Sequence, residues 1–219
     1  LLRAGAAPAL AERLGAVAYI DLAEQCLAAL DRLAADHPRA VLSAGGMGAA
    51  LGFIDFFPTG GQRAAAGLAA KMARGLTLGG GGGGGGGGPP AADVELAIGA
   101  VPLLAPLLHS GDARVVESGV AARGRVGAVL AGAAAAGSAE AAAAFGSAGL
   151  LASALQLTAT PGASGPASST YFGLIRLLGA AGAASGDAAA AILDGGGLAT
   201  VTALLSTSPL LCGRGADPA

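Results

Sequence analysis

A glycine-containing step followed by an apolar run recurs along the chain. The steps lie at residues 4–10, 44–47, 99–104, 148–151 and 196–198. Gly5 and Gly45 are 40 residues apart, and the later steps follow at intervals of 54, 50 and 48 residues. Self-similarity with a period of about 20 to 50 residues is typical of arrays in which each unit buries its apolar face against its neighbours. The chain is therefore predicted to fold as a stack of repeated units.

A run of ten glycines, residues 79–88, with Pro89 and Pro90 behind it, accounts for the longest interval. Without these twelve residues the interval of 54 becomes 42, within the length of about 40 to 47 residues found for armadillo and HEAT units. Each glycine costs a helix interior roughly 0.5 to 1 kcal/mol relative to alanine. Residues 79–90 are therefore expected to be a disordered insertion between two helices, with a second insertion at residues 158–169.

The composition favours helices and excludes several partners. Hydrophobic residues make up 53% of the chain, but only 3% are aromatic, so the apolar content is mainly helix-forming Ala and Leu. The formal charge is −2 and Lys and Arg do not cluster, so nucleic acid is not an expected partner. The most apolar stretch, residues 126–137, is shorter than the about 20 residues of a spanning helix, so no membrane is expected. We predict an all-α, armadillo/HEAT-like right-handed α-solenoid.

One unit shows the expected helix pair most clearly. Its first helix carries one apolar face, formed by Leu22, Cys26, Leu27, Leu30 and Leu33. Asp21 is the expected cap of this helix, which should end before His37 and Pro38 because the residue before a proline is steered out of the α region. A second helix should follow Gly45, with Met47, Leu51, Ile54 and Phe57 directed inward.

These units organise the whole chain. We expect a partial repeat at residues 1–15, about four armadillo-like units in residues 16–78 and 91–210, the insertion at residues 79–90, and a tail at residues 211–219. Two cysteines, Cys26 and Cys212, are too few for a disulfide framework and favour a reducing, intracellular compartment.

Two segments have a more specific pattern than a generic solenoid. Residues 53–63 read Phe-Ile-Asp-Phe-Phe-Pro-Thr-Gly-Gly-Gln-Arg, and residues 170–178 read Thr-Tyr-Phe-Gly-Leu-Ile-Arg-Leu-Leu. Both resemble the repeat region of plant KAKTUS-type HECT ubiquitin ligases, to which the animal thyroid-receptor-interacting HECT ligase is related. The resemblance implies a nuclear or cytoplasmic ligase in which this solenoid recruits or scaffolds substrate proteins. It also implies that E2-ubiquitin is engaged only through a HECT domain, which lies outside this chain.

No catalytic, cofactor or metal site is expected in the chain. The glycine-rich residues 44–52 lack the acidic residue about 20 positions on that a dinucleotide site requires. His37 and His109 have no Cys, Asp or Glu at metal-ligand spacing. Cys26 lies on the apolar helix face, and Cys212 lacks the Thr-Cys-Phe setting of the family's catalytic thiol. The parent protein is expected to be a ubiquitin transferase, and this segment non-catalytic.

Five polar or aromatic residues are candidates for binding a protein partner on the surface near the second helices: Asp55, Gln62, Arg63, Tyr171 and Arg176. Phe56 is expected in the core. A solvated rim, with Asp55 and Arg63 merely paired at a repeat junction, is the alternative for the polar residues. A second function is also open, an armadillo adaptor unrelated to ubiquitin. The import-receptor version of that adaptor reads basic peptides with Trp and Asn, and this chain contains neither.

Overall fold

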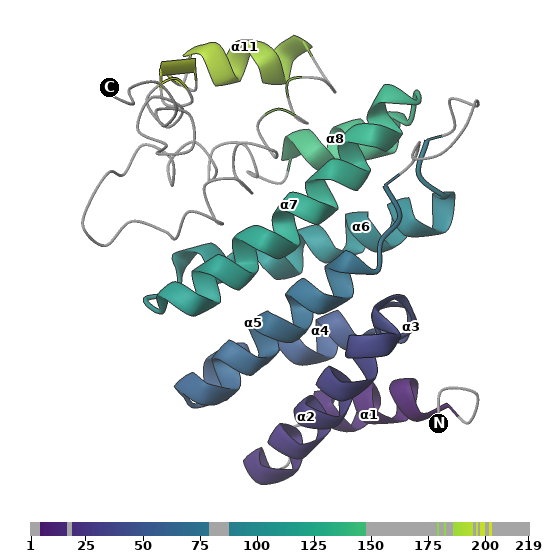
Figure 1. Cartoon of the computed structure of the whole chain (residues 1–219), viewed down its shortest axis with the longest axis vertical. Coiled ribbons are helices and arrows are strands. Elements are labelled where there is room, and N and C mark those ends of the chain that lie inside the picture. The colour runs from purple at the N-terminus through teal and green to yellow at the C-terminus, as the bar shows by residue number, and fades with distance from the viewer. Residues whose placement is uncertain are drawn as a thin grey trace, which may run out of the picture.

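A computed structural model describes residues 5–16, 19–78, 88–147 and 186–194, with single positions 179, 182, 196, 198, 199 and 202. Throughout these residues the chain forms helices and turns and no strand, which confirms the all-α class (Figure 1). The helices are α1 (Ala6–Gly15), α2 (Ile20–Asp36), α3 (Pro38–Ser43), α4 (Gly46–Leu51), α5 (Thr59–Arg74), α6 (Ala91–Leu104), α7 (Ala113–Ala135), α8 (Ala139–Ser147) and α11 (Gly186–Asp194), with short 3-10 turns η2 (Ile54–Phe56) and η3 (Pro106–His109).

The long helices α2, α5 and α7 pack side by side in one row, and α1, α4 and α6 form a second row behind them (Figure 1). Arg63 contacts Asp112 near the start of α5 and α7, and Arg125, midway along α7, contacts Leu76 just after the end of α5. Both pairs are separated by 49 residues in sequence. An equal separation at both ends of α5 means that α5 and α7 run parallel with one constant register.

The register between α2 and α5 gives the period without the glycine insertion. Lys71 on α5 bonds to Asp31 on α2 across 40 residues, which is nine fewer than the separation of 49 between α5 and α7. Residues 79–87 are nine in number and lie outside the described residues. These nine residues of the glycine run are enough to account for the difference between the two separations.

Gly88 and Pro89, which the sequence places inside the insertion, pack against the end of α7. A Cβ on Gly88 would lie 2.7 Å from Cβ of Ala136, and a Cβ on Gly132 would lie 3.5 Å from Cδ of Pro89. A distance of 2.7 Å is shorter than any ordinary carbon contact, so only glycine fits at position 88 without a shift of the neighbouring chain.

The predicted helix pair is present, with one correction. Helix α2 ends at Asp36, before Pro38, and Cys26 and Leu30 on its apolar face are buried. Gly45 has φ of 80°, a left-handed conformation that glycine adopts without strain, and α4 begins directly after it. Asp21 does not cap α2, because the helix begins at Ile20 and Tyr19 occupies the cap position without a side-chain bond. Asp21 therefore contributes only a favourable charge in the first turn.

The apolar stretch predicted from sequence at residues 126–137 is not the strongest one. Among the described residues, Ala91–His109 is long and apolar enough to cross a membrane by length and composition, with a mean hydropathy of 1.7. The Leu, Ile and Val residues of α6 outweigh the Ala and Gly of α7. The stretch packs within the array, where 44% of it is buried, and Asp93 near its start is fully buried in an ion pair. A core helix satisfies the same criteria of length and hydropathy.

Candidate protein-interaction surface

The predicted residues Gln62 and Arg63 both lie in the first turns of α5 and both have structural partners. Gln62 donates from Nε2 to the carbonyl oxygen of Phe57 over 3.0 Å, which ties the turn before α5 to the helix. Arg63 donates from Nε and Nη2 to Oδ2 of Asp112, at 2.9 and 2.6 Å. Arg63 is therefore paired at a junction between units, but its acid is Asp112 and not the Asp55 suggested by the sequence.

Asp112 serves two neighbouring helices at once. Its Oδ1 accepts from the backbone N–H groups of Arg114 and Val115, so it caps α7, while its Oδ2 accepts from Arg63 of α5. The hydrogen bond from Arg63 holds the pKa of Asp112 below its ordinary value, burial opposes that effect, and the two backbone bonds add to it. Because Arg63 is committed to this contact, its first role is to fix the junction between α5 and α7.

Asp55 is exposed in the turn before α5, near the same end of that helix as Arg63. The other two candidates, Tyr171 and Arg176, lie outside the described residues. The structure therefore brings Gln62 and Arg63 to one junction and leaves Asp55 on the adjacent turn.

A buried ion pair that sequence reasoning missed closes the base of the glycine insertion. Asp93 at the start of α6 is 0% exposed, and its Oδ1 accepts from Arg39 Nε at 2.7 Å and Nη2 at 2.6 Å. Its Oδ2 accepts from the backbone N–H of Thr77 at 3.0 Å. Thr77 lies before the glycine run and Asp93 after it, so Asp93 joins the two ends of the insertion to α3. Asp93 and Glu95 are the two acids of the otherwise apolar segment 91–104, and an acid directly after the insertion was the available signal.

Opposing effects set the pKa of Asp93. Burial is the largest of them and acts to raise the pKa, but the backbone N–H of Thr77 and the guanidinium of Arg39 together outweigh it. The pKa therefore lies below its ordinary value, and the carboxylate is charged at neutral pH. This charge is matched by Arg39, so the group is structural and is not poised to transfer a proton.

Arg123 on α7 is the opposite case, a buried charge without matching acceptors. Its side chain is 2% exposed, and Nε and Nη1 have no hydrogen-bond partner. Burial alone lowers the pKa of the guanidinium. The guanidinium is therefore a buried charge whose Nε and Nη1 hydrogen atoms are unmatched within the described part of the chain.

Large apolar side chains are exposed at the turns that lead into α2 and α5. Phe56, predicted in the core, is instead 71% exposed, while its neighbour Phe57 is 4% exposed and fills the core. Ile54 of the 3-10 turn is also buried, so the turn and the residue after it direct Ile54 and Phe57 inward and leave Phe56 outward. Phe53 and Phe56 contact each other with ring centroids 6.3 Å apart. Tyr19 and Ile20, at the start of α2, are 71% and 50% exposed. We call Tyr19, Ile20, Phe53 and Phe56 the apolar edge.

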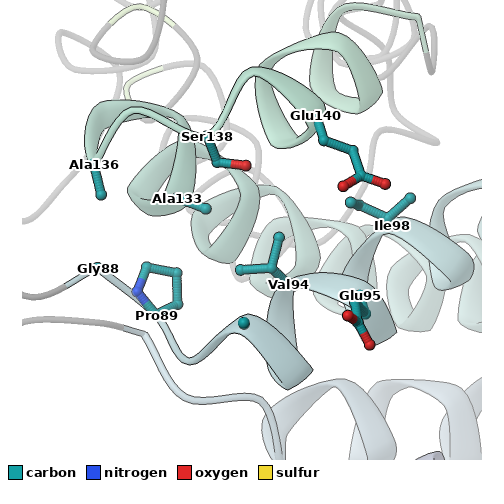
Figure 2. Close-up of a pocket in the computed structure, with 10 residues that line it drawn as sticks. Gly88, Pro89, Val94, Glu95, Ile98, Ala133, Ala136, Ser138 and Glu140 are labelled. Carbon is teal, nitrogen blue, oxygen red and sulfur yellow. The ribbon is translucent and has the colours of Figure 1, made fainter.

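A shallow cleft of about 310 Å³ lies between the start of α6 and the junction of α7 with α8 (Figure 2). Val94, Ile98 and Pro89 form apolar parts of its wall, and the carboxylates of Glu95 and Glu140 lie near one end. The hydroxyl of Ser138 accepts from the backbone N–H of Ala141, so it is committed to the start of α8. The lining lacks a nucleophile paired with a base, which acyl or phosphoryl transfer would need.

Metal ligands are likewise not gathered at one place in the residues that the structure describes. No group of three or more His, Cys, Asp or Glu side chains occurs there. Cys26 is free and buried, consistent with its predicted place on the apolar face of α2. The described surface can bind by shape, apolar contact and charge.

Comparison with known proteins identifies relatives of this arrangement. The family model described as "E3 ubiquitin-protein ligase TRIP12-like, TPR repeats" matches residues 1–43. The chain is 35% identical over 178 residues, 80% of its length, to the E3 ubiquitin-protein ligase UPL3 of Arabidopsis thaliana. It is 32% identical over 113 residues, 52% of its length, to the E3 ubiquitin-protein ligase TRIP12 of Danio rerio. The matches span only 8% and 5% of these two relatives.

The solved structures show the fold. A computationally designed armadillo repeat protein for modular peptide recognition matches with a TM-score of 0.67 and 17% identity, covering 94% of this chain and 77% of the designed protein. At this level of identity the likeness concerns the backbone arrangement alone. It confirms that the helical array is an α-solenoid of the armadillo type, as the sequence period predicted.

Proposed function

The chain is related to a segment of the UPL3- and TRIP12-type E3 ubiquitin-protein ligases, and we propose that it is a non-catalytic, protein-binding segment that recruits or scaffolds substrates for such a ligase. The observation that carries the proposal is the 35% identity to UPL3 over 80% of the chain. We also propose a place in the nucleus or the cytoplasm, as the resemblance to these ligases implies.

The row of α2, α5 and α7 supports a binding role. Successive long helices of a solenoid line up along one extended surface. Exposed positions on these helices include small residues such as Ala28, Ala64 and Ala121, which allow a partner backbone to approach closely. Arg32 of α2 and Arg74 of α5 are exposed and supply charge at the same row. Recognition of peptides by armadillo arrays is the stated purpose of the designed structural relative.

The test compares the complete ligase with and without this segment. We expect both forms to accept ubiquitin from an E2 as a reducible thioester, because the segment is proposed to hold no step of that transfer. We expect only the intact form to ubiquitinate its substrates. If deletion leaves substrate ubiquitination unchanged, the recruiting role is wrong.

The choice of point substitutions follows from the contacts. Arg63→Glu is a poor probe of binding, because it also breaks the contact with Asp112 that joins α5 to α7. Arg32→Glu and Arg74→Glu change exposed charges in the row and make a cleaner test.

The second candidate function, an adaptor unrelated to ubiquitin, is favoured instead if the complete protein forms no thioester with ubiquitin while the segment still captures partners.

A further inference from the structure

The apolar edge holds most of the large apolar side chains that are exposed on the described surface. Among the described residues six large apolar side chains are exposed, and four of them, Tyr19, Ile20, Phe53 and Phe56, lie at the turns into α2 and α5. Scattered apolar residues on a surface need no explanation, but a gathering of large ones marks an interaction site. The turn before α5 already supplies Ile54 and Phe57 to the core. The core at this turn is therefore filled without Phe53 or Phe56.

The two turns lie at the same end of neighbouring helices. The contact of Lys71 with Asp31 sets a register of 40 residues between α2 and α5, and these helices pack side by side. The start of α2 and the start of α5 accordingly lie along one margin of the array (Figure 1). With helix axes about 8 to 10 Å apart, a segment of a few residues is long enough to touch both turns.

The charge beside the apolar edge is acidic. Asp21 and Asp55 are exposed within two residues of Tyr19 and Phe56, respectively. Arg63, the cation at the start of α5, is bound to Asp112, which leaves Arg13 at the end of α1 as an exposed cation on a separate helix. Aromatic faces also attract cations within about 6 Å of the ring centre. Both features favour a cationic occupant over an acidic one.

We propose that the apolar edge docks a peptide segment of a partner protein in which apolar side chains alternate with Lys or Arg. The apolar side chains cover Phe53, Phe56 and the Tyr19–Ile20 pair, and the cations face Asp21 and Asp55. This inference rests on the proposed protein-recruiting function. It assigns capture of the partner protein to the apolar edge and not to the exposed face of the α2, α5 and α7 row.

The binding test uses a fluorescein-labelled peptide of about 14 Leu and Lys residues, long enough to span both turns, and a matched peptide of Leu and Glu. Fluorescence anisotropy at about 0.1 M salt, where exposed charges still act over about 10 Å, should show at least about tenfold tighter binding of the Leu–Lys peptide. The double substitution Phe53→Ser with Phe56→Ser should weaken that binding about tenfold or more, as loss of aromatic anchors does. Asp21→Lys with Asp55→Lys should remove the preference for Lys over Glu.

Leu193→Ser with Leu198→Ser provides the matched control, since these residues are 59% and 63% exposed and lie in or near α11, at the other end of the chain (Figure 1). This control should leave binding unchanged, and melting temperatures should show that all variants are folded. Equal binding of both peptides, or unchanged binding after the Phe substitutions, would overturn the proposal. So would a dimer that Phe56→Ser dissociates, because the edge would then be a contact between copies of this chain. If the edge variants keep substrate capture while Arg32→Glu and Arg74→Glu lose it, the docking edge is wrong and the recruiting function stands.

Discussion

Removal of the Asp93 carboxylate should weaken the array more than removal of any exposed acid. The carboxylate is 0% exposed and accepts from Arg39 and from the backbone N–H of Thr77. In Asp93→Ala the N–H of Thr77 loses its acceptor, a cost of about 1 to 3 kcal/mol for a buried group. Breaking a fully buried ion pair costs about 3 to 5 kcal/mol, but the Arg39 side chain is 51% exposed and regains water. We therefore expect a loss of about 3 kcal/mol in total.

The assay is thermal and urea unfolding of the purified chain. For a chain of this size a loss of about 3 kcal/mol corresponds to a fall of about 6 to 12 °C in Tm. The isosteric Asp93→Asn keeps an acceptor for Thr77 and should lose less. Asp31→Asn is the matched control, because the Asp31–Lys71 pair is about one third exposed on both sides, and such pairs contribute about 0 to 1 kcal/mol. A Tm of Asp93→Ala within 2 °C of wild type, or an equal fall in Asp31→Asn, would refute the reasoning.

The pH dependence checks the same group independently. The folded-state pKa of Asp93 lies below its ordinary value, so its contribution is fully present above the unfolded pKa of about 3.9. That contribution is lost as the pH falls through the lower, folded-state pKa. The difference in unfolding free energy between wild type and Asp93→Asn should therefore be constant near neutrality and shrink on acidification below about pH 4. A difference that grows on acidification contradicts the assignment.

Three further outcomes follow from the structure. Replacing residues 79–87 with a short Gly-Ser linker should leave Tm within a few degrees, since loop-closure entropy changes by only about 0.6 kcal/mol per doubling of length, whereas Gly88→Leu should lower Tm because of its contact with α7. Arg123→Met should raise Tm by about 2 to 4 °C, because an apolar side chain replaces a buried guanidinium without matching acceptors, and a lower Tm would show that Arg123 has a stabilising partner. Supplied with E1, E2, ubiquitin and ATP, the chain should form no thioester on Cys26 or Cys212, and a reducible adduct lost in Cys212→Ala would contradict this.

The helices and their period could be predicted because they depend on local rules. The proline after His37 ends α2, glycine at position 45 allows the left-handed turn, and Cys26 and Leu30 repeat at helical spacing. Each of these signals lies within a few residues of the feature that it sets. The glycine run was also recognisable, because no helix interior accommodates it.

The contacts between units were not predictable in the same way. Phe56 and Phe57 are adjacent and chemically identical, and only the 3-10 turn at residues 54–56 decides that Phe57 is buried and Phe56 is exposed. Arg63 and Asp55 are close in sequence, yet Arg63 binds Asp112 from 49 residues away. Propensity and periodicity carry no information on which acid of a later unit comes within reach of a given base.

The distribution of these contacts explains how one array accommodates an insertion of glycines. Asp93, after the glycine run, accepts hydrogen bonds from the backbone N–H of Thr77 before the run and from Arg39 of α3, so it links the two ends of the insertion to α3. Arg125 holds the carbonyl oxygen of Leu76 at the same level, which keeps α5 and α7 in the register that Arg63 sets at their other end. Because the junction is fixed on both sides of residues 79–87, the length of that segment changes the closure entropy but not the geometry of the row. The surface of α2, α5 and α7 can therefore present a constant spacing to a partner whatever the number of glycines.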